Sequence, residues 1–168
     1  PILFNNEWNL HFTNGGPFIP SDKKMKSAKP WTSFINDSTT QYFSGTGTYS
    51  TSFNLNKNAD DYILQLDKLY ESANVIVNGK DAGIIWSLPF KLNIGKYLKQ
   101  GENKIEIAVC NLMANRIRYM DRSKMEWRKY HEINFVNINY KNFDAADWKV
   151  QLSGLDGDIK IIPVQFSK

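Results

Sequence analysis

Four tryptophans are the side chains best suited to contact a ligand: Trp31, Trp86, Trp127 and Trp148. An indole presents a flat apolar face that can stack on the C–H face of a sugar ring, whereas the sugar hydroxyls need planar polar partners such as Asn, Asp and Arg. Trp148 alternates with Val150 and Leu152, so we expect it in the core. Trp86 stands at the end of a predicted strand, where loops often carry function, and this favours a functional role there.

Catalytic chemistry has little support among the remaining reactive side chains. His11 alternates within an N-terminal strand and is expected at the surface or an edge, while Cys110 is expected as a half-buried thiol in a strand. One cysteine and two distant histidines form neither a zinc site nor an internal disulfide. Carboxylate pairs of the glycosidase kind can come from distant strands and stay open as an alternative. No catalytic residue is assigned.

Neighbouring aspartates form clusters of oxygen donors at three places: Asp60-Asp61, Asp144 with Asp147, and Asp156 with Asp158. Such a cluster, together with backbone carbonyls, can hold a structural calcium ion, although the spacing matches no EF-hand loop. We therefore predict no cofactor and leave a structural calcium ion open at one of these pairs.

Strands must position these side chains, because alternation with a period of two residues dominates the sequence. Residues 47–55 place Tyr49, Phe53 and Leu55 on one face and polar side chains on the other. Similar stretches predict further strands at residues 8–12, 62–66, 73–77, 89–94, 103–111 and 159–164. Many short strands without βαβ alternation are typical of an all-β sandwich.

Turn and helix signals complete the expected organisation. Asn78-Gly79 separates two apolar stretches and favours a tight hairpin turn. Ser123 and Glu126 fit a capping box, which predicts one short helix near 123–131. Residues 13–46 are rich in Gly, Pro, Ser, Thr and Asn, and are expected as a long loop, ordered around the sandwich or flexible. No linker interrupts the chain, so residues 1–168 are predicted to form a single module.

The charge of the chain is local. The 168 residues carry a formal net charge of +4 and 42% hydrophobic residues, which excludes a largely disordered chain. Residues 112–131 hold six of the 21 basic residues and two of the 17 acidic ones, so the remaining chain is balanced. No apolar run is long enough for a transmembrane helix. A nucleic-acid partner would need the aromatic side chains of this basic segment as stacking platforms, and we do not expect one.

Several short sequence motifs occur in an order typical of one family. They are Ser44 to Tyr49 (SGTGTY), Ala73 to Lys80 (ANVIVNGK), Gly83 with Trp86, Pro89 and Phe90, Gly101 to Asn103, Asn111 to Arg116, and Ser153 to Gly157. This order resembles the sugar-binding β-sandwich domain of family 2 glycoside hydrolases. It resembles still more closely the C-terminal sandwich of bacterial α-L-rhamnosidases of glycoside hydrolase family 106.

The resemblance implies a galactose-binding-domain-like jelly roll whose catalytic carboxylates would sit on a separate barrel that this chain is too short to contain. In such enzymes the sandwich packs on the barrel and sometimes binds sugar. Asn115-Arg116 can either fix a loop or grip hydroxyls or a carboxylate of a ligand. The family pattern usually continues with two apolar residues, Gly and Asp, whereas here Ile117 is followed by Arg118, Tyr119 and Met120, and a role for Asp121 is not carried over.

The sequence therefore predicts a non-catalytic carbohydrate-binding or accessory module of a bacterial glycoside hydrolase, with an α-L-rhamnosidase-like parent. The predicted carbohydrate contacts are Trp86, Asn115, Arg116 and Trp127. The expected partners are carbohydrate, including uronate-bearing glycans, and the catalytic domain, with no nucleic acid and no membrane. A purely structural domain docked through residues 112–131 is the alternative, and it predicts an exposed apolar patch at Met120, Met125 or Trp127. Because the chain begins with Pro1 and not with Met, we expect an excised domain or a processed protein. The resemblance implies a secreted or periplasmic location.

Overall fold

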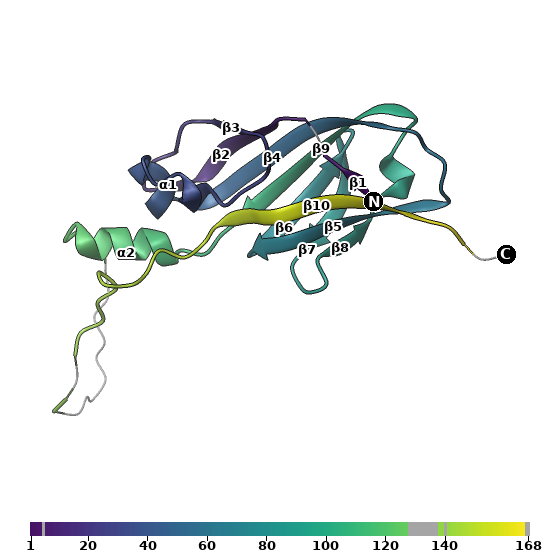
Figure 1. Ribbon diagram of the computed structural model, residues 1–168. Coiled ribbons are helices and arrows are strands. Elements are labelled where there is room, and N and C mark those ends of the chain that lie inside the picture. The colour runs from purple at the N-terminus through teal and green to yellow at the C-terminus, as the bar shows by residue number, and fades with distance from the viewer. Residues whose placement is uncertain (5, 128–137, 140, 167–168) are drawn as a thin grey trace.

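The computed structural model describes residues 1–4, 6–127, 138–139 and 141–166. Ten strands build two antiparallel sheets that face each other (Figure 1). The strands are β1 (Ile2–Leu3), β2 (Trp8–Gly16), β3 (Lys23–Met25), β4 (Ser44–Leu55), β5 (Asp61–Tyr70), β6 (Ser72–Val77), β7 (Lys80–Ile85), β8 (Lys91–Asn93), β9 (Gly101–Cys110) and β10 (Gly154–Val164). The helical elements are η1 (Trp31–Ser33), α1 (Ser38–Tyr42), η2 (Gly95–Tyr97) and α2 (Ala114–Arg122).

The two sheets differ in size and share a sandwich topology. The smaller sheet has the strand order β1-β10-β5-β8, and the larger has the order β3-β2-β4-β9-β6-β7. Strand β9 lies between β4 and β6, and the register places Ile107 beside both Tyr49 and Val75. The alternation seen in the sequence is therefore the alternation of one buried and one outward face, as expected for an antiparallel sheet with one face on the core.

The core lies between the sheets and confirms the predicted all-β sandwich. Alternate residues of the central strands are fully buried: Tyr49, Ile105, Ile107, Val109, Val75, Val77, Tyr62, Leu64, Leu155 and Ile161. Tyr49 joins the layers, because its hydroxyl donates to the Lys29 carbonyl at 2.8 Å and accepts from the Leu155 amide at 3.3 Å. Burial raises the pKa of this phenol, which keeps it a neutral donor.

The predicted turn at Asn78-Gly79 is confirmed. It joins β6 to β7 through the facing pair Val77 and Lys80, and both turn residues have positive φ, 51° at Asn78 and 77° at Gly79. Two positive φ values are the requirement of the tight hairpin turns that follow the twist of the strands. A short helical turn, η2, follows β8.

The predicted helix near 123–131 is misplaced. A short helix forms earlier, as α2 over Ala114–Arg122, and Ser123, expected at its start, is its C-cap, with the Ser123 amide donating to the Tyr119 carbonyl at 2.9 Å. Residues 123–127 form a turn and an irregular stretch, with Lys124 at a φ of 53°, and residues 128–131 lie outside the described residues. The helix starts without a side-chain N-cap, so no capping signal marks its first turn.

Other expectations also differ from the structure. The segment 13–46, expected as a long loop, contains the end of β2, strand β3, the short helices η1 and α1, and the start of β4. Trp148 is 40% exposed rather than in the core, because residues 148–153 are irregular and β10 begins only at Gly154. The Cys110 thiol is exposed rather than half-buried. His11 is exposed, as expected, and its Nδ1 lies 2.8 Å from a carboxylate oxygen of Asp22.

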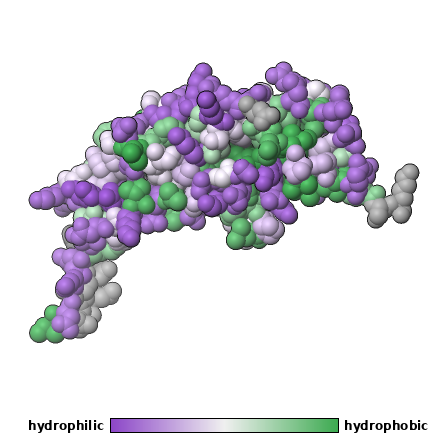
Figure 2. Space-filling view, viewed as in Figure 1, coloured by the Kyte–Doolittle hydropathy of each residue, from purple (hydrophilic) through white to green (hydrophobic). Residues whose placement is uncertain are grey.

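Both α-helices lie at one end of the sandwich, where β5, β7 and β9 end and β10 begins (Figure 1). A space-filling view from the same side shows polar side chains over most of the surface, with apolar side chains gathered in patches between them (Figure 2). The four predicted contacts belong to this helical end. Trp86 follows β7, Asn115 and Arg116 lie in α2, and Trp127 follows α2.

Candidate functional site

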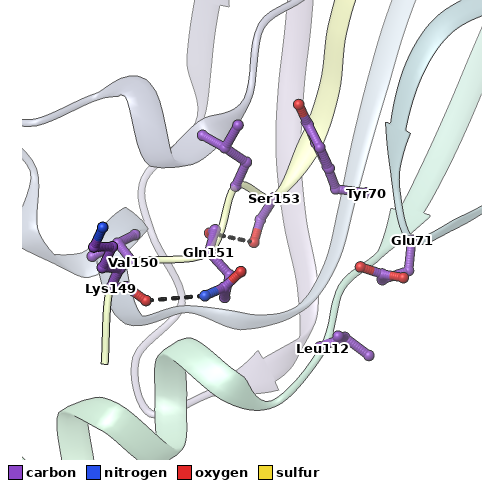
Figure 3. Close-up of a pocket in the computed structure, with 8 residues that line it drawn as sticks. Tyr70, Glu71, Leu112, Lys149, Val150, Gln151 and Ser153 are labelled. Atoms are coloured by element: carbon purple, nitrogen blue, oxygen red, sulfur yellow. Dashed lines mark hydrogen bonds between the residues drawn. The ribbon is translucent and has the colours of Figure 1, made fainter. Parts of the chain in front are cut away.

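A cleft opens at the helical end of the sandwich. One wall is Tyr70 and Glu71, where β5 passes into β6, and the facing wall is the irregular segment Lys149–Ser153 that leads into β10 (Figure 3). Leu112 also lines the cleft and lies below Glu71 in this view (Figure 3). The cleft has a volume of about 320 Å³, which is at the lower end of the range for small-molecule sites.

A second hollow continues the cleft along the same segment. It is lined by Leu112, Ala114, Trp148, Lys149 and Gln151 and has a volume of about 500 Å³. Three of these residues also line the cleft, so the two hollows share a rim. Trp148, which the sequence analysis assigned to the core, thus borders an open hollow with its indole partly exposed.

The wall at 149–153 is fixed by a buried asparagine of α2. Asn115 is 1% exposed, its Oδ1 accepts from the Gln151 amide at 2.8 Å, and its Nδ2 donates to the Gln151 carbonyl at 2.8 Å. The side chain thereby offers Gln151 the same pair of hydrogen bonds that a neighbouring strand would offer. Asn115 Nδ2 also lies 3.3 Å from Ser153 Oγ. These hydrogen bonds fix the loop, which is one of the two alternatives that the sequence leaves open for Asn115-Arg116.

Asn111 extends this network to the larger sheet. Its Nδ2 donates to the Phe43 carbonyl at 3.0 Å and to Ser153 Oγ at 2.9 Å, while its Oδ1 accepts from the Gly45 amide at 2.9 Å. The wall of the cleft is consequently tied to β4, α2 and β10 at once. A wall held by buried hydrogen bonds is pre-organised, which reduces the entropy lost on binding.

The polar groups of the cleft carry charge of both signs. Glu71 and Lys149 come from facing walls, and Gln151 places its side-chain amide beside the Lys149 carbonyl, 3.3 Å away (Figure 3). Burial, followed by the nearby Asp156 carboxylate, raises the pKa of the Tyr70 phenol, so Tyr70 is a neutral donor or acceptor at neutral pH. Glu71 is the one carboxylate among the described lining residues, so the cleft lacks the facing pair that glycoside hydrolysis requires.

Arg116 lies on a different face of α2 from Asn115. Its guanidinium is packed against Gly16, at 3.0–3.4 Å from the position that a Cβ would take there. Its Nε is buried without a hydrogen-bond partner, and none of the ion pairs among the described residues includes it. Adjacent in sequence, Asn115 and Arg116 are thus directed to two separate surfaces.

Trp86 and Trp127 differ in exposure. Trp86 follows β7 and is 73% exposed, with exposed Ile84 and Leu88 beside it in the sequence. The pairing of Ile85 with Ala73 places Trp86 at the same end of the sheet as Glu71. Trp127 is half-buried, and its Nε1 donates to Asp121 Oδ1 at 2.6 Å.

An aromatic chain connects Trp127 with the second hollow. The ring of Phe143 lies edge-on to Trp127 at 6.3 Å and edge-on to Trp148 at 5.5 Å between centroids. Asp121 also accepts from the Ala145 amide at 2.7 Å, so this carboxylate orders the segment leading to Trp148. The sequence analysis missed this role, because nothing in the spacing of Asp121 and Ala145 predicts a contact.

Five of the six aspartates considered for calcium make other contacts. Asp60 and Asp61 accept backbone amides of Phe166 and Tyr62, and Asp144 accepts the amide of Ala146. Asp156 lies 3.1 Å from Lys68 Nζ, and Asp158 lies 3.0 Å from Lys160 Nζ. Within the described ranges no three His, Cys, Asp or Glu side chains converge as a metal site would require.

Membrane insertion through a helix finds no support in the described part of the chain, because none of its helices is both long and apolar enough to span a bilayer. Met125, one of the residues named for the docking alternative, is 48% exposed, while Met120 is half-buried. Apolar side chains are also exposed around the mouth of the cleft, at Leu112, Met113 and Leu152.

Comparison with known proteins relates this chain to domains of glycoside hydrolases. Residues 24–155 match the glycosyl hydrolase 2 galactose-binding domain-like family. A Formosa agariphila protein whose name is that of a β-glucuronidase is 33% identical over 96% of this chain and 15% of its own length. The structure of a rhamnosidase from Novosphingobium sp. PP1Y superimposes with a TM-score of 0.75 at 27% identity, covering 96% of this chain and 15% of that one.

More distant structures share the fold alone. A Bifidobacterium dentium β-glucuronidase, solved with coumarin-3-O-glucuronide, has a TM-score of 0.54 at 22% identity over 64% of this chain and 20% of its own. In each comparison the chain spans only a small part of the larger protein, 15% for the Formosa and Novosphingobium proteins.

Proposed function

Because this chain belongs to the galactose-binding-like domain family of family 2 glycoside hydrolases, we propose that it is the accessory sandwich of an α-L-rhamnosidase-like enzyme and that it engages carbohydrate in the cleft between Glu71 and Gln151. Hydrolysis would belong to another domain. The rhamnosidase structure supports this choice of parent, because it covers almost the whole chain at the higher TM-score. We also propose a secreted or periplasmic bacterial location for the parent enzyme.

One observation carries the carbohydrate role: a rigid wall that combines polar groups with an exposed indole. Gln151, Lys149 and Glu71 supply donors and acceptors for hydroxyls, and the partly exposed Trp148 supplies an apolar face for a sugar ring. Among the residues predicted as contacts, Asn115 and Trp127 serve to position this wall in our proposal. Trp86 is retained as a contact at the rim of the same end.

The test is a calorimetric titration of the 168-residue chain with L-rhamnose and rhamnose-containing oligosaccharides. We expect binding in the millimolar range, reduced at least tenfold by Trp148→Ala and by Gln151→Ala. If Trp86 contacts the sugar at the rim, Trp86→Ala should reduce the affinity less than the two cleft variants do. Unchanged affinity would show that Trp86 makes no contact with the sugar. Ile35→Ala changes an exposed apolar side chain elsewhere and is the matched control. Unchanged affinity in both cleft variants would refute the assignment of the cleft.

A specific observation favours the second candidate, a domain that packs on the catalytic domain without binding sugar. Leu112, Met113 and Leu152 are each about half exposed at the mouth of the cleft, and Met125 follows α2. Exposed apolar side chains that gather in one region mark interaction surfaces. Absence of any heat with sugars, combined with loss of association between the chain and its catalytic domain in a Met113→Ser/Leu152→Ser variant, would establish this candidate instead.

A further inference from the structure

An aromatic cluster lies on the face of α2 that carries Arg116. Tyr42 of α1 and Tyr119 of α2 are stacked with ring centroids 4.1 Å apart, and Phe18 lies edge-on to both at 6.4 and 6.5 Å. Phe18 is 55% exposed, so the cluster opens to solvent at this ring. Gly16, on which the Arg116 guanidinium is packed, precedes Phe18 by two residues, so the guanidinium and the rings belong to one surface.

Arg116 is a cation without a counterion in this surface. The ion pairs among the described residues all use lysine or histidine, and the buried Nε of Arg116 has no acceptor. A partly exposed guanidinium that has no ion pair is available to an anionic ligand through its terminal nitrogens.

The charged side chains near Arg116 in the sequence have other partners or lie elsewhere. Arg118 donates from its Nε to the Trp148 carbonyl, and burial, followed by Arg122, lowers the pKa of Arg118. The one carboxylate of α2, Asp121, is occupied by Trp127 and the Ala145 amide. Asp37, which precedes α1, is paired with Lys23 at 2.6 Å.

From these observations we propose that Arg116, Phe18, Tyr42 and Tyr119 form a second subsite, which binds the uronic-acid residue of an acidic oligosaccharide. The planar guanidinium can hold a carboxylate through two parallel hydrogen bonds, and the exposed ring of Phe18 can stack on the C–H face of the sugar that bears it. This subsite rests on the proposed carbohydrate role of the domain but lies on a different face of α2 from the cleft.

The combination of groups favours a uronate over other anions. Inorganic phosphate and acetate satisfy a guanidinium but have no ring to place on the aromatic cluster. A neutral hexose satisfies the rings but brings no charge to pair with the Arg116 guanidinium. A uronate supplies both a carboxylate and a C–H ring face within a single sugar residue.

The experiment is a titration of the chain, by calorimetry and amide chemical shifts, with an oligogalacturonide and with a neutral oligosaccharide of equal length. We expect the uronate ligand to bind at least tenfold more tightly, and Arg116→Gln to remove that preference. Arg122→Gln makes the same charge change at an exposed position of the same helix and is expected to alter affinity less than twofold. Because Arg116 Nε has no hydrogen-bond partner and Arg116 takes part in none of the ion pairs among the described residues, Arg116→Gln should keep the melting temperature of the parent chain.

The outcomes separate this subsite from the cleft. Equal losses in Arg116→Gln and Arg122→Gln, equal binding of acetate, or no preference for the uronate in the folded chain would each overturn the proposal. Loss of neutral-sugar binding in Trp148→Ala with the uronate preference intact supports two independent sites. Absence of neutral-sugar binding with an Arg116-dependent uronate response would refute the cleft and support the subsite. If the catalytic domain shifts the amide signals around Arg116 and the uronate ligand does not, Arg116 is a contact with protein, and the proposal is overturned.

Discussion

Gly154, the first residue of β10, is where a single methyl group would have the clearest effect. Its φ is 110°, and a Cβ there would collide with the Tyr49 hydroxyl, which joins the two sheets. We expect Gly154→Ala to lower the free energy of unfolding by about 3 kcal/mol or more, since backbone strain and overpacking add. Urea denaturation followed by tryptophan fluorescence measures this change.

The matched control is Gly79→Ala in the β6–β7 turn. Gly79 also has positive φ, 77°, but nothing lies within 4 Å of the position of a Cβ. Strain alone is expected to cost about 1 kcal/mol there. Equal losses in the two variants would show that the Tyr49 contact contributes nothing.

Asn115 gives a second prediction at the scale of one residue. Asn115→Ala removes two hydrogen bonds to the Gln151 backbone and leaves both backbone groups without their partner. The expected loss of stability is about 2–3 kcal/mol, from the unsatisfied polar groups. Because the wall of the cleft is fixed by these bonds, hydrogen exchange of the Gln151 amide should accelerate more than the global loss accounts for. Asn54→Ala, at an exposed position of β4, is the control and should change stability by less than about 0.5 kcal/mol.

Residue types indicated candidate contacts in the sequence but not their surroundings. Asn115 and Arg116 were recognisable as polar side chains after a strand, yet only the position of α2 against Gln151 and Gly16 divides their roles. Trp148 was assigned to the core from alternation with Val150 and Leu152, and that was wrong because the segment does not pair with a strand. Alternation of apolar and polar residues indicates the buried face of a segment only where that segment pairs with a neighbouring strand.

At the scale of elements, the N-cap of α1 links stability to pH. Asp37 Oδ1 accepts the Thr39 amide at 3.0 Å, and the hydrogen bond from Lys23, followed by that from Thr39, holds the pKa of the Asp37 carboxyl below its usual value. Asp37→Ala is expected to cost about 1 kcal/mol at neutral pH. A carboxyl with a lowered folded pKa stabilises the fold above its unfolded pKa, and this contribution disappears as pH falls through the folded pKa.

The stability difference between the parent chain and Asp37→Ala should therefore be constant from neutral pH to about pH 5 and shrink below about pH 4. Urea denaturation at a series of pH values measures it. Asp158→Ala removes an exposed carboxylate at the register shift of β10 and should show little difference at neutral pH. A difference that grows on acidification would contradict the role assigned to Lys23 and Thr39.

Elements differed in how well the sequence predicted them. Strands were found because burial on one side imposes a period of two, and the Asn78-Gly79 turn because its backbone requires those residues. Helix α2 was misplaced because it lacks a capping side chain and is held by Asn115 and Asp121, which contact residues 24 to 36 positions away. Interactions at that separation leave no local pattern.

At the scale of the whole molecule, the exposed apolar side chains at the mouth of the cleft make a prediction about association. A Met113→Ser/Leu152→Ser variant should bind less of a hydrophobic dye and associate less with its catalytic domain, while stability changes by less than about 0.5 kcal/mol. Dye fluorescence and sedimentation velocity measure these effects. Ile35→Ser, at an exposed site in another part of the chain, is the control, and an equal effect there would contradict a localised docking surface.

The pair formed by Asn115 and Gln151 has a consequence for the construction of variants. It fixes the segment before β10 to α2 through side-chain-to-backbone bonds rather than through a strand ladder. An insertion beside Asn115 or Gln151 should therefore detach the cleft wall from α2, while the strand ladders of the sandwich keep their pairing. Grafted peptides and reporter tags that must leave the cleft intact have to avoid both positions.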